Sequence, residues 1–196
     1  YARHQEGHFG AILVLGDANA GKTTLCRRLA ETWCASQKVV HLFPPEGGSI
    51  EPMQFKSRLE DAVKVHGDYD EIFRAIPLGG VLVINDLELW WERSPGGMVV
   101  IDILLELVDK FSERTTFLIN TNPYSYQIIN QVKPITQAFV GVVECGPFDV
   151  EEIQQAVLRR HRSAGLTFQL SDHDESALSD FALARLFTGN FDVSSG

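Results

Sequence analysis

The sequence predicts an α/β protein with a mainly parallel sheet. Residues 16–23 form a glycine-rich motif between an apolar run and an amphipathic helical pattern, which is the order strand, loop, helix. Residues 81–84 are apolar at every position, as is typical of a strand covered on both faces of a parallel sheet. Apolar runs and helical patterns alternate through most of the chain, so strands and helices are expected to alternate as well.

The glycine-rich motif follows the apolar run 11–15, which predicts the first strand. Leu25, Leu29 and Trp33 then lie on one stripe of a predicted helix over residues 24–33. Glycine lets the backbone turn tightly and approach phosphate oxygens, which the N–H groups and the positive end of the helix dipole attract. The motif fits G-x-x-x-x-G-K-[ST] and predicts a phosphate-binding loop made of Gly16, Asp17, Ala18, Asn19, Ala20, Gly21, Lys22 and Thr23.

Three side chains of this segment have predicted roles. Lys22 is expected to reach the β- and γ-phosphates of a nucleotide, and the Thr23 hydroxyl is expected to bind Mg²⁺. Thr24, the next helical residue, is a candidate contact to the α-phosphate. The alternative interpretation is a glycine-rich turn that ends in a capped helix. It does not explain why the flanking segments are the strand and the helix that a phosphate-binding loop requires.

The segment between the loop and the second motif has weaker signals. Residues 38–43 are β-branched and apolar and end at two prolines, which predicts a second strand. Residues 52–65 carry a helical stripe that begins at a proline, a residue suited to the first helical position. One or two further helical turns are expected within residues 68–76.

A second candidate motif, Asn85 to Glu88, follows the strand 81–84 at the end where parallel sheets bind ligands. In one assignment Asp86 holds Mg²⁺ through water and Glu88 polarises the attacking water. In the other, Asn85 takes the metal position and Asp86 acts as the base. We favour the first, because a carboxylate suits hydrated Mg²⁺ better than an amide and hydrolysis needs an acceptor for water. Asp86 as a turn former and Glu88 as a surface residue stay open alternatives.

The next elements are a buried helix and a strand. Residues 98–111 are almost all apolar apart from an acidic stripe, which predicts a helix packed on the sheet. Residues 115–120 predict a strand. Asn122 follows it, where its side chain is a candidate to contact the γ-phosphate or the attacking water. Asn122 also suits the N-cap of a helix over residues 123–130, and the two roles are compatible.

A fifth strand is predicted at residues 139–143. Beyond it, Asp149 and Glu152 form an acidic variant of the capping box, which predicts a helix over residues 149–161. Another capped helix start is expected near residue 171.

The order of the phosphate loop, the acidic strand end at Asp86 and the polar strand end at 120–122, followed by a helical tail, resembles the AAA+ and related signal-transduction P-loop ATPases. The resemblance implies a three-layer αβα sandwich with a five-stranded, mainly parallel sheet in residues 1–147. It implies the start of a helical lid in residues 148–196, with ATP and Mg²⁺ as ligands. The strand-terminal asparagine that this family calls sensor 1 maps first to Asn122 and second to Asn120.

Two features depart from that family. Members often place an arginine finger before the fifth strand, but residues 133–139 contain no arginine, and Lys133 is a weaker point charge that can stand in its place. The sequence also ends before the helix that carries the family's second sensor arginine. We expect it to be a part of a longer chain with further domains, and a homo-oligomer is left open.

Composition limits the class of protein. A net charge of −9 and a pI near 5.1 argue against a broad nucleic-acid-binding surface. No apolar run approaches the roughly 20 residues that cross a bilayer. Cys26, Cys34 and Cys145 lack metal-type spacing and are expected to be reduced and buried, which favours a cytoplasmic location.

We therefore expect an ATPase that binds ATP and uses Mg²⁺-dependent hydrolysis to drive conformational change in a larger protein or assembly. Two alternatives stay open: a nucleotide-dependent switch with little turnover, and a small-molecule or nucleotide kinase, which needs an acceptor pocket. GTP is less favoured because no N-K-x-D element follows the expected strand.

Overall fold

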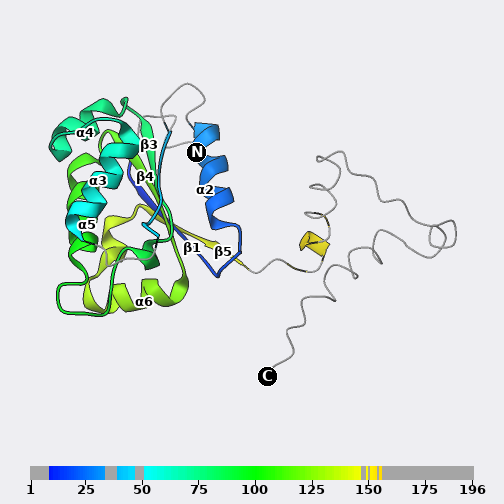
Figure 1. Ribbon diagram of the computed structural model, residues 1–196. Coiled ribbons are helices and arrows are strands. Elements are labelled where there is room, and N and C mark those ends of the chain that lie inside the picture. The colour runs from blue at the N-terminus through cyan, green and yellow to red at the C-terminus, as the bar shows by residue number, and fades with distance from the viewer. Residues whose placement is uncertain are drawn as a thin grey trace. The chain divides into compact units, whose positions relative to one another are not determined.

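A computed structural model describes residues 9–33, 39–46, 51–146, 149, 151–153 and 155 of the 196-residue chain. The chain divides into two units, residues 1–146 and 147–196. Figure 1 shows the helices and strands of the first unit. The predicted roles of residues 1–147 as a core and 148–196 as a lid stay predictions, because most of the second unit lies outside the described residues.

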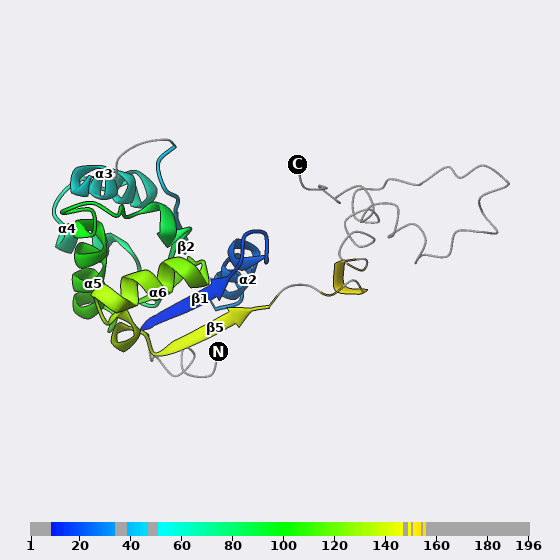
Figure 2. The same cartoon turned by 90° about the horizontal axis from the view of Figure 1, so that it is seen from below.

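The first unit is built around a sheet of five parallel strands. The strands are β1 (Ala11–Gly16), β2 (Val39–Leu42), β3 (Gly80–Ile84), β4 (Thr115–Thr121) and β5 (Gly141–Cys145). Their order across the sheet is β2-β3-β4-β1-β5, and every neighbouring pair is parallel. β4 therefore lies between β1 and β3, and the carboxyl ends of all three strands meet at one edge of the sheet. Figure 2 shows β5 beside β1.

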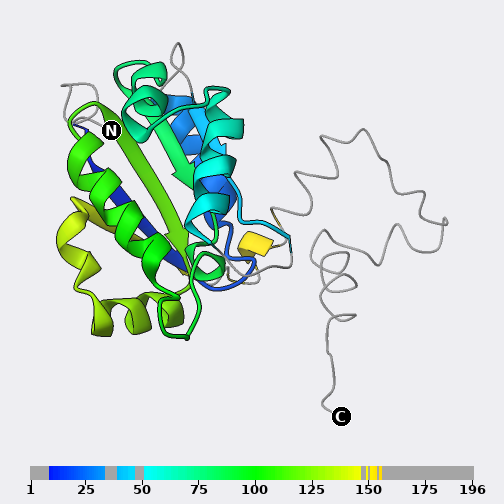
Figure 3. The ribbon, with the colours of Figure 1, turned by 60° about the vertical axis from the view of Figure 1, so that its left-hand side comes forward.

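Helices cover both faces of the sheet and make it the middle of three layers. The α-helices are α2 (Lys22–Trp33), α3 (Pro52–Val63), α4 (Tyr69–Ala75), α5 (Val99–Phe111) and α6 (Pro123–Val132), and the short 3₁₀ helices are η1 (Leu87–Leu89) and η2 (Ile135–Ala138). α2 packs on one face, and residues of the other four α-helices join the core on the opposite face, which comes forward in Figure 3. The predicted α/β fold class is confirmed.

Alternate residues of the central strands face the two helical layers. In β3, Leu82 and Ile84 join the larger core with α3, α4 and α5, whereas Val81 and Val83 pack with Cys26 of α2. All five residues of β3 and all seven of β4 are buried. This double burial explains why residues 81–84 of β3 form a continuous apolar run rather than an alternating pattern.

Several element ends differ from the predicted ones. The fifth strand occupies Gly141–Cys145 rather than residues 139–143, and it pairs Gly141 with Ile12 and Cys145 with Gly16. Pairing with β1 thus sets the register of β5. The apolar residues of its own sequence do not set it, because some of them stay exposed on this outermost strand. The helix predicted over 52–65 ends at Val63, because Lys64 adopts a left-handed conformation with φ 63°. The 3₁₀ helices η1 and η2 were not expected.

Two capping boxes mark helix starts. At α4 the Asp68 carboxylate accepts from the backbone N–H of Glu71 at 2.8 Å, and the Glu71 carboxylate accepts from the N–H of Asp68 at 2.9 Å. The predicted box of Asp149 and Glu152 is also present, with distances of 3.0 and 2.7 Å. The remainder of that helix to residue 161 and the start near residue 171 lie outside the described residues.

Two further expectations concern cysteines and membrane segments. Cys26 is buried as predicted, Cys145 is partly buried and both are free thiols, while Cys34 lies outside the described residues. Burial raises the pKa of the Cys26 thiol to about 11, which keeps it protonated at neutral pH.

Among the helices of the described ranges, none has the length and apolar character needed to cross a bilayer.

The capping box of α4 predicts a measurable loss of stability. We expect Asp68→Ala to lower the free energy of unfolding by about 1 kcal/mol, because the first turn of α4 then loses a hydrogen-bond acceptor. Urea unfolding followed by circular dichroism measures the change. Asp61→Ala, at an exposed position of α3, is the control and is expected to change stability by less than about 0.5 kcal/mol. Equal effects of the two substitutions would contradict the assigned cap.

Candidate functional site

The predicted phosphate-binding loop connects the end of β1 to the first turn of α2. Within it Asn19 has φ 63° and Gly21 has φ 84°, conformations that asparagine and glycine tolerate better than most residues. The N–H of Ala20 donates to the carbonyl of Asp17 at 3.2 Å and closes a turn. Since α2 begins at Lys22, the N–H groups of its first turn have no partners within the helix and face the loop, where an anion can accept from them.

The first glycine of the motif allows β5 to approach the loop. A Cβ at Gly16 would lie 2.9 Å from the Cβ of Cys145 and 3.2 Å from the Cγ of Lys22. A side chain at this position therefore displaces either the edge strand or the stem of the lysine. Gly16 is required by this close approach rather than by an unusual backbone angle, because its φ is not in the left-handed region.

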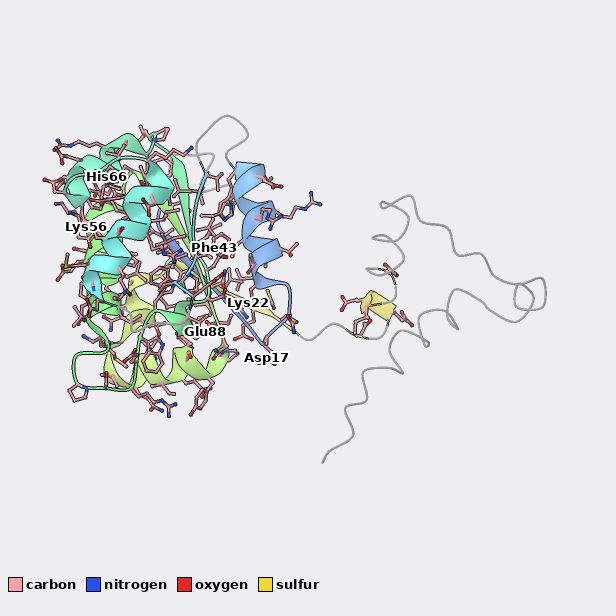
Figure 4. All side chains as sticks on the ribbon, in the orientation of Figure 1. Asp17, Lys22, Phe43, Lys56, His66 and Glu88 are labelled. Atoms are coloured by element: carbon pink, nitrogen blue, oxygen red, sulfur yellow. The ribbon has the colours of Figure 1, made fainter. Side chains whose placement is uncertain are left out.

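Lys22 lies inside the loop rather than in solvent. Only 6% of its surface is exposed, and its Nζ donates to the carbonyl of Asp17 at 2.9 Å. Figure 4 shows Lys22 and Asp17 at the same edge of the sheet as Glu88. Thr23 is half-buried and Thr24 is exposed, both in the first turn of α2. The ammonium group is thus held against the backbone of the loop at Asp17.

Asn85 and Asp86, which were the alternatives for the metal position, lie after β3 in different surroundings. Asn85 is fully buried, its Nδ2 donates to the carbonyl of Leu42 at 3.2 Å, and its Oδ1 accepts from Asn120 at 2.9 Å. Asp86 is half-buried and adopts a left-handed conformation with φ 52° and ψ 58°. The amide of Asn85 is therefore engaged by protein groups on both sides, and Asp86 is the more accessible of the two.

The carboxylate of Asp86 lies in an unfavourable electrostatic environment. Burial raises its pKa, the neighbouring carboxylate of Glu88 raises it further, and the ammonium of Lys22 acts in the opposite direction. A bound cation beside Asp86 relieves both unfavourable effects. The described residues contain no cluster of three or more His, Cys, Asp or Glu that can hold a metal alone. A nucleotide-bound Mg²⁺ needs only one or two protein ligands. The assignment of Thr23 and Asp86 as these ligands stays a prediction.

Glu88 and Asn122 are brought together across two strand ends. The Oε2 of Glu88 accepts from the backbone N–H of Asn122 at 3.2 Å. The Oδ1 of Asn122 accepts from the N–H of Ser125 at 2.7 Å, which makes Asn122 the N-cap of α6. The predicted capping role is present. The contact of Asn122 with a γ-phosphate stays a prediction.

Asn120 and Lys133 have contacts that the sequence pattern did not predict. Asn120, the second choice for the strand-terminal asparagine, is fully buried and contacts both Asn85 and the backbone of Asp86. The signal for such a role was a polar amide directly after the apolar residues 117–119 of the predicted strand. Lys133, considered as a replacement for an arginine finger, forms an ion pair with Asp102 of the same chain.

Comparison with known proteins gives a result at the level of structure. Neither a protein-family profile nor a curated protein sequence matches the chain. The P216G mutant of RuvB from Thermotoga maritima matches with a TM-score of 0.56 and 15% identity, over 84% of this chain and 48% of that one. ORC1 from Aeropyrum pernix in complex with DNA has a TM-score of 0.58 and 14% identity, over 83% and 46%. ORC2 from the same organism, in ADPNP–ADP complexes, has a TM-score of 0.58 and 12% identity, over 82% and 48%.

The chain has the fold of an AAA+ P-loop ATPase core. The expected likeness to this class is confirmed at the level of the fold, because identities of 12–15% establish the fold alone. The chain spans about half the length of these solved structures.

The setting of Asp86 predicts that the nucleotide-free fold is stabilised when its charge is removed. We expect Asp86→Asn to raise the melting temperature at pH 7, because the folded-state pKa lies above the unfolded one and ionisation therefore opposes folding. Asparagine also tolerates the left-handed backbone.

The pH dependence gives the control for this prediction. The cost of ionisation develops as pH rises from the ordinary Asp value of about 3.9 through the raised folded-state value. The stabilisation by Asp86→Asn should therefore be smaller at about pH 3.5, below the ordinary Asp value, than at pH 7, which thermal unfolding in the absence of nucleotide and Mg²⁺ measures. A lower melting temperature for the variant at pH 7 would contradict the electrostatic assignment.

Proposed function

We propose that this chain binds ATP with Mg²⁺ at the loop 16–23 and hydrolyses it, and that the resulting conformational change acts on attached domains or neighbouring proteins. One observation carries the proposal. Lys22, Asp86 and Glu88 come from different parts of the sequence, and the β2-β3-β4-β1-β5 order brings them to one edge of the sheet. The fold shared with RuvB and with the nucleotide-bound ORC2 supports it.

Phosphate binding is assigned to the loop and its lysine. The N–H groups of residues 16–24 and the dipole of α2 favour the negative charge of the phosphates. Lys22 leaves its carbonyl partner, Asp17, for a phosphate oxygen, which is a stronger acceptor because it is charged. Thr23 and Asp86 would hold Mg²⁺, which when bound neutralises charge on the β- and γ-phosphate oxygens.

Activation of water is assigned to Glu88. Among the contacts of the described residues its Oε2 accepts from the N–H of Asn122, which restrains the carboxylate and leaves Oε1 to accept from a water molecule. The carboxylate thus keeps its protein contact while it orients the nucleophile. Asn122 contributes through this N–H even where its side chain remains on α6.

The ion pair of Lys133 favours a second function, the nucleotide-dependent switch with slow turnover in the isolated chain. A cation that acts on a neighbouring nucleotide has to leave its own chain's anions. Lys133 is paired with Asp102, so its charge is neutralised at the position where an arginine finger is expected. Phosphate release measured as turnover per chain separates the switch from an efficient ATPase.

Removal of Lys22 tests the binding assignment. We expect Lys22→Ala to weaken binding of a non-hydrolysable ATP analogue by at least about tenfold, because a charge-assisted contact to phosphate is lost. Isothermal titration calorimetry measures the affinity. Lys56→Ala is the matched control: this lysine lies on α3 in an exposed pair with Glu60, and its loss should leave affinity unchanged. Unchanged affinity in Lys22→Ala would remove the central assignment.

Neutralising Glu88 tests the hydrolytic assignment. Glu88→Gln should reduce turnover by about 10²–10⁴-fold while nucleotide affinity is retained, because the amide no longer accepts a proton from water. Steady-state phosphate release gives the turnover number. Glu113→Gln, an exposed change just before the amino end of β4, is expected to have no effect on turnover. Full turnover in Glu88→Gln would leave Asp86 as the candidate base, and transfer to an added acceptor in preference to water would favour a kinase.

A further inference from the structure

Two asparagine side chains face each other inside the core, next to the proposed site. Asn85 and Asn120 both have 0% of their surface exposed. The Nδ2 of Asn120 donates to the Oδ1 of Asn85 at 2.9 Å. Buried amides have to be hydrogen-bonded to offset the loss of water, whereas apolar residues fill such a space without this requirement. The pair therefore points to a positional role rather than to packing alone.

The two amides form a continuous set of hydrogen bonds across three strands. The Nδ2 of Asn85 donates to the carbonyl of Leu42 in β2, and its Oδ1 accepts from Asn120 in β4. The Oδ1 of Asn120 then accepts from the backbone N–H of Asp86 at 2.9 Å. This connectivity follows the sheet order β2-β3-β4 and ends on the residue assigned to Mg²⁺.

The last of these bonds acts on a strained piece of backbone. Asp86 has φ 52° and ψ 58°, a left-handed conformation that residues other than glycine adopt in only a few per cent of cases, although asparagine and aspartate do so more often than most. The Asn85 carbonyl accepts from the Nε1 of Trp90 at 2.9 Å, so the peptide between Asn85 and Asp86 is held on both sides. Strain of this kind persists only where surrounding groups enforce it, and it is typical of functional sites.

The amide of Asn120 is fully engaged by these contacts. Its oxygen accepts from Asp86 and its nitrogen donates to Asn85, with a long contact of 3.9 Å to the sulfur of Cys26. A γ-phosphate oxygen can accept only from its Nδ2 group, which is fully buried and already donates to Asn85. These contacts favour a role inside the core over the sensor role for which Asn120 was the second choice.

We propose that Asn120, anchored by Asn85, is a positioning residue that holds Asp86 in the left-handed conformation from which its carboxylate serves nucleotide-bound Mg²⁺. The inference rests on the proposed function, because it takes Asp86 as the metal-side carboxylate. Asn120 itself touches neither nucleotide nor metal, and acts through the backbone of Asp86.

Asn120→Leu tests the inference, since leucine has a similar size and no hydrogen-bonding group. The measured quantity is the gain in affinity for a non-hydrolysable ATP analogue that added Mg²⁺ produces, determined by calorimetry. We expect the variant to bind the analogue without Mg²⁺ as the unmodified chain does, and to lose about 10–100-fold of the Mg²⁺-dependent gain, as is typical when the partner of a metal ligand is removed. With Mg²⁺ present, the KM for ATP should rise by a similar factor, because KM follows the weaker binding of the metal–nucleotide complex when hydrolysis is slow.

A matched control and a second variant separate positioning from general loss of stability. Thr115→Val changes a buried residue at the other end of β4 whose hydroxyl has no hydrogen-bond partner within the described part of the chain, and it should leave the Mg²⁺-dependent gain intact. Asn85→Leu should reduce the gain in the same way as Asn120→Leu. The double variant should be no worse than Asn120→Leu alone, because the two residues act through one bond to Asp86.

The outcomes distinguish this inference from the proposed function. A folded Asn120→Leu variant that keeps the full Mg²⁺-dependent gain would overturn the positioning role while nucleotide binding stands. If circular dichroism shows that this variant does not fold, Asn120→Thr takes its place and should lose the Mg²⁺-dependent gain in the same way. Threonine suits a strand and is too short to bridge Asp86 and Asn85. Failure of the unmodified chain to bind the analogue would overturn the proposed function, and this inference with it.

Discussion

The insertion of β4 between β1 and β3 is the constraint on which the site depends. Parallel pairing places Leu15 opposite Thr121 and Ile84 opposite Ile119, so these three strands end at one edge of the sheet. The loop that follows β1, the acidic turn that follows β3 and the N-cap that follows β4 therefore converge, although they are far apart in the sequence. The double burial of the central strands holds this register, because a slip by one residue would turn apolar side chains toward the wrong layer.

The convergence produces an imbalance of charge that a metal–nucleotide complex can correct. Asp86 and Glu88 repel each other, Asp86 is partly removed from water, and Lys22 gives only part of the compensating charge. Lys22 meanwhile donates to a neutral carbonyl within its own loop. A ligand that carries negative phosphates and a divalent cation supplies a better partner to each of these groups. In a chain with a net charge of −9, the divalent cation is the part of such a ligand that makes its approach favourable.

The sequence allowed prediction of those features that local chemistry determines. The glycine-rich loop, the strands read from apolar runs and the N-cap at Asn122 depend on a few neighbouring residues, and the structure shows each of them. The position of β5 depends on pairing with β1, so its local pattern misplaced it by two residues at each end. The contact of Asn85 with Asn120 depends on the order of strands across the sheet, which no pattern along the chain contains. The roles of Lys22 and the other site residues stay predictions.

The contacts of Glu88 also suggest how chemistry at the sheet edge reaches the helices. Its bond to the N–H of Asn122 joins η1 to the first turn of α6. Tyr124, in the first turn of α6, accepts from Arg93 in the loop before α5, and Lys133, which follows the last turn of α6, is paired with Asp102 of α5. The helix that Glu88 contacts is therefore connected to α5 and to the loop before it. If Glu88 takes the role proposed for it, its contact with the first turn of α6 is a physical route from the site to the outer layer, and a double-mutant cycle measures whether the two are coupled.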